Sequence, residues 1–278
     1  MNTEAALAAL LRKDRAIALV ALITLTTIAW APVLLLAQSM AHMAAMRGMT
    51  DMPGMTDMPG MHGDPLGMMS RVFRQWNAGH FLAMLSMWTV MMIGMMTPSV
   101  APMILIYTRI ARCNAVLRPF ASAFWFAGGY LLCWTGFSLL ATLTQWGLEQ
   151  LALLTPMMAS ASHVFGGLLL ILAGIYQWLP IKQACLSQCR APLTFVMSHG
   201  GFRADPAGSV RLGLQHGLYS IGCCWTLMAL LFVGGIMNLL WIAALMIFVL
   251  LEKLLPASRN FARISGLGAA TLGIGYLF

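Results

Sequence analysis

Long apolar runs alternate with short polar segments along most of this chain. A helix needs about 20 apolar residues to cross the roughly 30 Å of hydrocarbon in a bilayer. The runs that approach this length lie at 16–37, 81–108, 120–144, 160–180, 213–234, 236–252 and 261–278. The pattern predicts an all-α protein, a polytopic transmembrane helix bundle with about seven spans.

The composition agrees with a membrane protein. Of 278 residues, 60% are hydrophobic and 9% are charged, which lies outside the usual range of soluble globular domains. The first run follows Arg12, Lys13 and Arg15, as the apolar segment of a secretory signal would. It is longer than the roughly 7–15 apolar residues of such signals, so we expect a retained anchor.

Lysine and arginine predict the orientation of the spans, because basic segments beside a span stay in the cytoplasm. Only Arg47, Arg71 and Arg74 would lie on the outer face, which predicts a cytoplasmic N-terminus. The other basic residues precede the first span or lie in alternate connections: Arg12, Lys13, Arg15, Arg109, Arg112, Arg118, Lys182, Arg190, Arg203, Arg211, Lys253, Arg259 and Arg263. The predicted regions are an N-terminus with the first anchor (1–37), an outer loop (38–80) and a six-span core (81–278).

The net charge of +8 is spread over four cytoplasmic segments and forms no single basic stripe. The lipid bilayer is therefore the expected partner, and no nucleic acid is expected. The outer loops hold none of the six cysteines, which lie at Cys113, Cys133, Cys185, Cys189, Cys223 and Cys224. Free thiols are expected in place of a disulfide framework.

The outer loop places methionine at every third position. The repeat consists of Met40, Met43, Met46, Met49, Met52, Met55, Met58 and Met61, and His42 and His62 accompany it. A thioether is a soft, uncharged ligand that suits Cu(I), and packing cannot explain apolar side chains in so polar a stretch. The repeat predicts a loop that captures soft metal; the alternative is a neutral low-complexity expansion.

The second span carries a methionine stripe. Met84, Met87, Met91 and Met95 follow the spacing of one helical face, and Met92 and Met96 broaden it. Pro98 and Pro102 predict a kink just beyond the stripe. These methionines are candidate ligands, although methionine in a helix also serves as packing.

The fifth span contains polar and sulfur side chains within the predicted membrane region, where polar groups are costly. His216, Ser220 and Cys223 share a helical face, with Cys224 at its flank and Met228 about one turn beyond. Ionisable residues inside a span are candidates for function. Successive side chains point about 100° apart on a helix, so we expect one vicinal cysteine to bind metal and the other to pack.

Two further cysteines follow the fourth span. Cys185 and Cys189 are four residues apart, which stacks both thiols on one helical face, and Pro192 predicts that the helix ends nearby. Lys182 and Arg190 would favour the thiolate that binds metal. Two thiolates suffice for near-linear Cu(I), whereas zinc needs four donors.

The segments "MWTVMMIGMMTPSVAP", "GIYQWLPIKQACLSQCRAP" and "GCCWTLMALLFVGGIMN" together resemble a bacterial family of uncharacterised, predicted metal-binding integral membrane proteins. The resemblance extends over most of residues 84–253 and implies a multi-pass protein of the bacterial inner membrane, with the methionine-rich loop in the periplasm. It also implies that these residues occupy signature positions: Cys185, Cys189, Cys223, Cys224, Met91, Met95, Met96 and Met228. The family usually has alanine before the methionine pair, where Gly94 and Met95 stand here, and it lacks the outer repeat.

The sequence favours a protein that binds Cu(I) for uptake or transfer, with copper as its metal ion and a cuproenzyme or copper chaperone as its protein partner. No Walker motif or phosphorylated-aspartate motif is present, so phosphoryl transfer does not drive the process, and the balance leans away from an enzyme. The alternatives are an assembly factor or accessory subunit of a membrane cuproenzyme, a membrane metalloenzyme, and a mercuric ion importer. The small number of histidines argues against the metalloenzyme. The outer thioethers argue against the mercuric ion importer, because thioethers bind mercuric ion less well than thiols do.

Overall fold

The structure, a computed structural model, describes residues 76–114, 119–155, 158–254 and 258–277. The predicted first anchor and the outer methionine repeat, with His42 and His62, lie outside these residues. Within them the regular structure is helical, and Leu154 and Ser160 form an isolated bridge. The all-α prediction is confirmed for this part of the chain.

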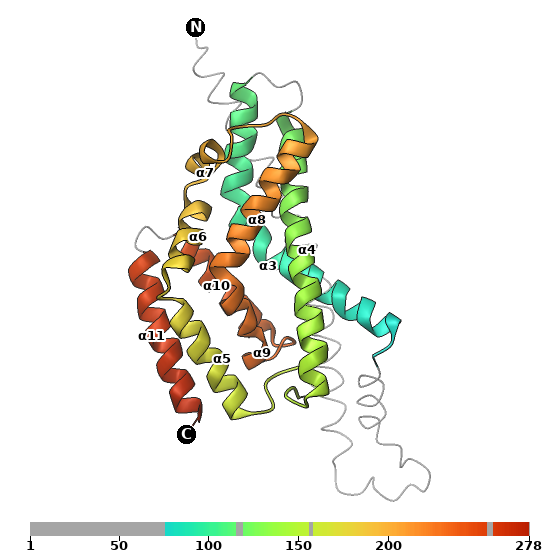
Figure 1. Cartoon of the computed structure of the whole chain (residues 1–278), viewed down its shortest axis with the longest axis vertical. Helices are drawn as coiled ribbons and strands as arrows, with labels where there is room; N and C mark the ends of the chain where they lie inside the picture. The colour runs from blue at the N-terminus through green and yellow to red at the C-terminus, as the bar shows by residue number, and fades with distance from the viewer. Residues whose placement is uncertain (1–75, 115–118, 156–157, 255–257, 278) are drawn as a thin grey trace, which may run out of the picture.

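The helices follow one another with short connections (Figure 1). Their bounds are α3 (Ala78–Cys113), α4 (Pro119–Gln150), α5 (His163–Tyr176), α6 (Pro180–Arg190), α7 (Pro192–Ser198), α8 (Pro206–Ala229), α9 (Leu231–Gly234), α10 (Leu239–Leu254) and α11 (Ser258–Leu277). Helix α3 runs through Pro98 and Pro102 without a break in its assignment, and Figure 1 shows it bent along its length. The bend agrees with the predicted kink.

Three helical segments in the described ranges are long and apolar enough to cross a membrane: α3, α4 and the α8–α9 segment. A fourth results if α5 and α6 count as one span bent by 67°. The predicted fourth span thus breaks before Pro180, which begins α6. Helix α10 has 16 residues, short of the roughly 20 that a perpendicular span needs. The seven-span prediction is therefore not reached within the described ranges.

Helices α4 and α8 lie side by side because glycines let their backbones meet. A Cβ atom on Gly129 would lie 2.2 Å from the carbonyl oxygen of Val210, and one on Gly213 would lie 2.0 Å from that of Phe126. Small residues permit such close packing of membrane helices. Glycines also line the α5–α11 contact, where a Cβ on Gly174 would lie 2.6 Å from a backbone oxygen of α11.

Gly129→Ala is expected to destabilise the protein by about 1–3 kcal/mol, the usual cost of forcing extra atoms into a packed interior. Gly128→Ala is the matched control, because a Cβ there meets nothing within 4 Å and alanine favours the helix. Thermal unfolding of both variants in the same detergent checks this prediction. Equal midpoints for the two variants would contradict the close α4–α8 contact.

Candidate metal centre

Helix α6 presents two cysteines to α8. It begins at Pro180 and ends at Arg190, two residues before Pro192, as the sequence predicts. Cys185 and Cys189 lie one turn apart and are partly exposed. The sulfur of Cys185 lies against Gly222 of α8, where an added Cβ would approach it to 2.8 Å. The absence of a side chain at Gly222 therefore makes room for this thiol.

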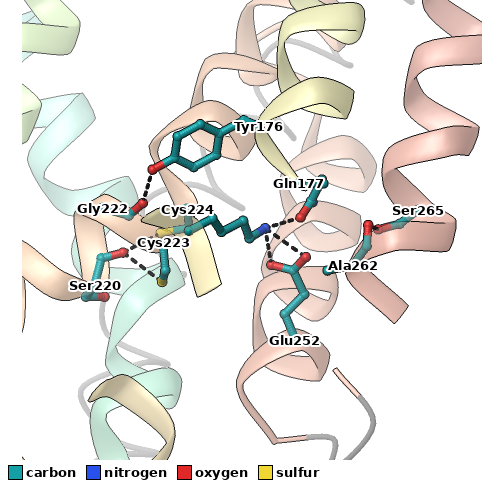
Figure 2. Close-up of polar contacts among 10 residues, drawn as sticks. Tyr176, Gln177, Ser220, Gly222, Cys223, Cys224, Glu252, Ala262 and Ser265 are labelled. Atoms are coloured by element: carbon teal, nitrogen blue, oxygen red, sulfur yellow. Dashed lines mark hydrogen bonds and ion pairs between the residues drawn. The ribbon is translucent and has the colours of Figure 1, made fainter. Parts of the chain in front are cut away.

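The vicinal cysteines of α8 are both buried and turn toward one oxygen. The Sγ atoms of Cys223 and Cys224 donate to the carbonyl oxygen of Ser220 over 3.1 and 3.0 Å (Figure 2). This carbonyl lies three and four residues back, where helical side chains point. Although successive side chains leave a helix about 100° apart, both thiols bend back to the same turn, and which of them binds metal stays a prediction.

These four cysteines form one group, which we call the thiol cluster (Cys185, Cys189, Cys223 and Cys224). The side chain of Cys223 interacts directly with those of Cys189 and Cys224, and Cys185 is close enough to interact with it electrostatically. The two pairs come from α6 and α8 and are separated by more than thirty residues of sequence. The structure thus brings together two cysteine pairs that the sequence places in separate segments.

The donor set of the thiol cluster suits a soft ion of low coordination number. No group of three or more His, Cys, Asp or Glu side chains in the described ranges has the arrangement of a metal site. Two thiolates satisfy Cu(I), for which sulfur ligands are selective.

A buried ion pair lies beside the cluster. Lys182 of α6 and Glu252 of α10 meet at 2.8 Å with side-chain exposures of 0% and 2%, and Gln177 accepts a further hydrogen bond from Lys182. The hydroxyl of Tyr176 donates to the carbonyl oxygen of Gly222, as Figure 2 shows. These contacts tie the α5–α6 break to α8 and α10. They also give Lys182, which the sequence predicts to favour the thiolates, a carboxylate partner.

Lys253 is buried, although the sequence predicts it among the cytoplasmic charges that set topology. It is 8% exposed and donates to Ser220 Oγ at 2.9 Å and Ser99 Oγ at 3.1 Å. It interacts electrostatically with three thiols of the cluster, those of Cys189, Cys223 and Cys224. Lys253 stands at the end of an apolar run, and this position is the signal that the sequence offers. Ionisable residues within spans usually mark functional sites.

His216 lies inside the bundle, on the buried face of α8 that also carries Ser220 and Cys223. It is 2% exposed, and its ring packs among those of Phe126, Tyr130 and Phe195. Its Nδ1 atom has no hydrogen-bond partner. The predicted shared face is confirmed, while a ligand role for His216 stays a prediction.

The methionine stripe of α3 faces inward. Met84, Met91, Met92, Met95 and Met96 are buried, as is Met228 of α8, and Met87 packs against the core at partial exposure. Burial agrees with a core role and with a ligand role alike. Their function as ligands stays a prediction, and so does capture by the outer repeat.

Comparison with protein families identifies the chain. The family model of PpoB2, described as a copper chaperone, matches residues 85–276. This protein belongs to the PpoB2 copper chaperone family. The match contains the thiol cluster, both buried lysines and all helices from the body of α3 to α11. Comparisons with curated proteins and with solved structures found no match. Membership in a copper chaperone family supports the copper-related part of the sequence prediction.

Proposed function

We propose that this protein is a membrane-embedded copper chaperone that holds Cu(I) in the thiol cluster and passes it to a copper-requiring protein. The convergence of two cysteine pairs from α6 and α8 carries this proposal. Membership in the copper chaperone family supports copper as the cargo and delivery as the role. It also favours copper over mercuric ion.

The surface supports a place in the bilayer. Large apolar side chains point outward on several helices, with exposures of 70% for Phe124, 63% for Leu218 and 84% for Leu240. Contiguous exposed apolar surface is unfavourable in water, and within the described ranges three to four helices have the length and composition of spans. We therefore place α3, α4 and α8 across the inner membrane of a bacterium, with the outer methionine repeat in the periplasm.

The arrangement of the four thiols suits transfer better than permanent storage. Two thiolates hold Cu(I), so the cluster has thiols to spare, and the ion can exchange between neighbouring sulfurs without leaving the site. Cys185 and Cys189 are partly exposed while Cys223 and Cys224 are buried. The partly exposed pair of α6 offers the path by which the ion arrives or leaves.

Lys253 supplies the charge that the loaded site needs. Two thiolates and one Cu(I) ion carry a net charge of −1, and an isolated charge is costly to bury. Lys253 has Ser99 and Ser220 hydroxyls as its hydrogen-bond partners, whereas the positive charge of Lys182 is paired with Glu252. The Lys253 ammonium thus neutralises the bis-thiolate complex.

Lys253→Met is expected to weaken Cu(I) binding by about 10- to 100-fold, the range typical for loss of a partner just outside the ligand shell. Competition with a chromophoric Cu(I) chelator measures the affinity. Arg263→Met is the control, because it removes one positive charge from an exposed position on α11. If both variants bind Cu(I) as wild type does, Lys253 does not compensate the loaded cluster.

Delivery and transport are distinguished by reconstitution. We expect liposomes that contain the protein and enclose a Cu(I)-sensitive dye to accumulate no copper. Copper-loaded protein in nanodiscs should instead metallate a soluble copper-binding domain, and Cys223→Ser should abolish this transfer. Accumulation of copper in the liposome lumen that depends on Cys223 would contradict delivery and establish transport.

A further inference from the structure

The end of α4 holds a polar cluster that the thiol site does not use. Gln145 is fully buried, and its amide nitrogen Nε2 donates to Glu149 Oε1 at 2.8 Å, to Met158 Sδ at 3.4 Å and to Met84 Sδ at 3.7 Å. Both thioethers are themselves buried, with exposures of 6% and 7%. Two sulfurs and one carboxylate oxygen from three separate segments therefore converge on one nitrogen.

The orientation of this amide is determined by Trp88. The indole nitrogen of Trp88 can only donate, and it donates to Gln145 Oε1 at 2.7 Å. The NH₂ group must then be the end that faces the sulfurs and the carboxylate. It has two protons for three acceptors, so at least one electron-pair donor is left without a proton. The three acceptors around Nε2 therefore favour a positively charged group or ion at its position.

The connection after α4 is folded so that Met158 reaches this position. Leu154 and Ser160 form a bridge, and Met158 N donates to Thr155 O at 2.8 Å. Met158 adopts φ = 56°, a left-handed conformation that is uncommon for residues other than glycine. Such conformations cluster at functional sites, where the surroundings hold them in place. The backbone of this turn is thus held in an unfavourable state while its thioether points inward.

Glu149 is held from the other side. Its second oxygen, Oε2, accepts from the indole nitrogen of Trp76 at 2.7 Å, which leaves Oε1 directed at the amide. Trp76 lies two residues before α3 begins, and the outer loop with the methionine repeat precedes it in the sequence. The group lies at the end of α4 away from α6 and α7 (Figure 1).

We propose that Met84, Met158 and Glu149 form a second soft-metal site, with the Gln145 amide occupying the ion's place when the site is empty. The inference rests on the proposed function for copper as the cargo. Two thioethers select a soft monovalent ion such as Cu(I), and the single carboxylate balances its charge. Methionine side chains have three rotatable bonds, so both sulfurs can close on an ion once the amide swings aside.

This site binds Cu(I) more weakly than the thiol cluster, because neutral thioethers replace anionic thiolates. Its first ligand, Met84, follows the outer methionine repeat in the sequence, and the site lies at the opposite end of α4 from the N-terminal part of α8. A weaker site there receives the ion first, and the thiol cluster then draws it onward. Only the ligands of Cu(I) change at each step, with no change in oxidation state.

Methyl NMR of the full chain in nanodiscs, with ¹³C-labelled methionine methyl groups, tests this site with Ag(I) as the probe. Met84→Leu and Met158→Leu variants assign the two signals. During titration the signals of Met84 and Met158 are expected to shift together with one midpoint. The signal of Met103, a buried methionine of the same helix, should not move. Glu149→Gln should weaken the Ag(I) affinity at this site by at least about tenfold, as loss of a ligand or its close partner does.

Signals of Met84 and Met158 that stay fixed while other methionines respond, or that shift with separate midpoints, would overturn the proposal. A Cys223→Ser variant separates this result from the thiol cluster. If the shifts persist in that variant, the site exists independently of the cluster. Failure of the cluster to bind Cu(I) would overturn the proposed function and leave these shifts unaffected.

Discussion

Cys223→Ser is expected to lower the Cu(I) affinity of the thiol cluster by at least about 100-fold, the upper end of what loss of an outer-shell partner costs a metal site. Cys223 is the centre of the cluster, since it interacts with the side chains of both Cys189 and Cys224. A serine hydroxyl is a hard donor that stays protonated and binds Cu(I) poorly. Cys189→Ser should have a similar effect, because it removes the partner from α6.

Competition against a Cu(I) chelator at fixed pH measures this loss. The matched control is Cys133→Ser. Cys133 also packs against α8, where its Cβ would lie 2.6 Å from a Cβ added to Gly217, but it lies outside the thiol cluster. Its variant should bind Cu(I) as wild type does. Equal losses in the Cys133 and Cys223 variants would show that disturbance of the α4–α8 packing, and not loss of a ligand, caused the change.

Glu252→Gln is expected to lower the free energy of unfolding by about 3–5 kcal/mol, the cost of leaving a buried charge without its partner. Lys182 is fully buried and Glu252 is 2% exposed, so water cannot replace the lost carboxylate. A glutamine keeps the size of the side chain and one acceptor oxygen. The decrease in the free energy of unfolding therefore measures the loss of the negative charge, and not the opening of a cavity.

The double variant Lys182→Met with Glu252→Leu is the control for this pair. Replacing both members of a buried ion pair with apolar groups is often neutral or stabilising. We expect the double variant to unfold at a higher temperature than Glu252→Gln in the same detergent. If Glu252→Gln unfolds at the wild-type temperature, the pair does not hold α6 against α10.

The sequence predicts the local helical structure around the cysteines, but it does not predict that the pair of α6 contacts the pair of α8. The spacing of Cys185 and Cys189, with Pro192 after them, is enough to predict a short helix with both thiols on one side, because spacing and proline act locally. The contact between this helix and Cys223 depends on how α6 packs against α8. Periodicity carries no information about which helices become neighbours.

Lys253 and the α5–α6 bend show the same limit. Counting basic residues predicts topology from average positions, and it cannot tell a lysine at the surface from one that turns inward toward Ser220. The fourth apolar run has the length of a span, but Pro180 begins a new helix and the chain bends by 67° there. Of the second metal site proposed above, the sequence indicates Met84 alone, because Glu149 and Met158 come from α4 and a turn and share no spacing with it.

Cysteine thiolates, and not thioethers, hold the tightest Cu(I) in the function that we propose. X-ray absorption at the copper edge tests it most directly, on protein whose methionines are replaced by selenomethionine and that is loaded with one Cu(I) per chain. Every methionine ligand then appears as selenium and every cysteine ligand as sulfur. We expect sulfur neighbours alone in the wild type and their loss in the double variant of Cys189→Ser and Cys223→Ser. Selenium, nitrogen or oxygen as the main neighbours of the first copper would contradict it.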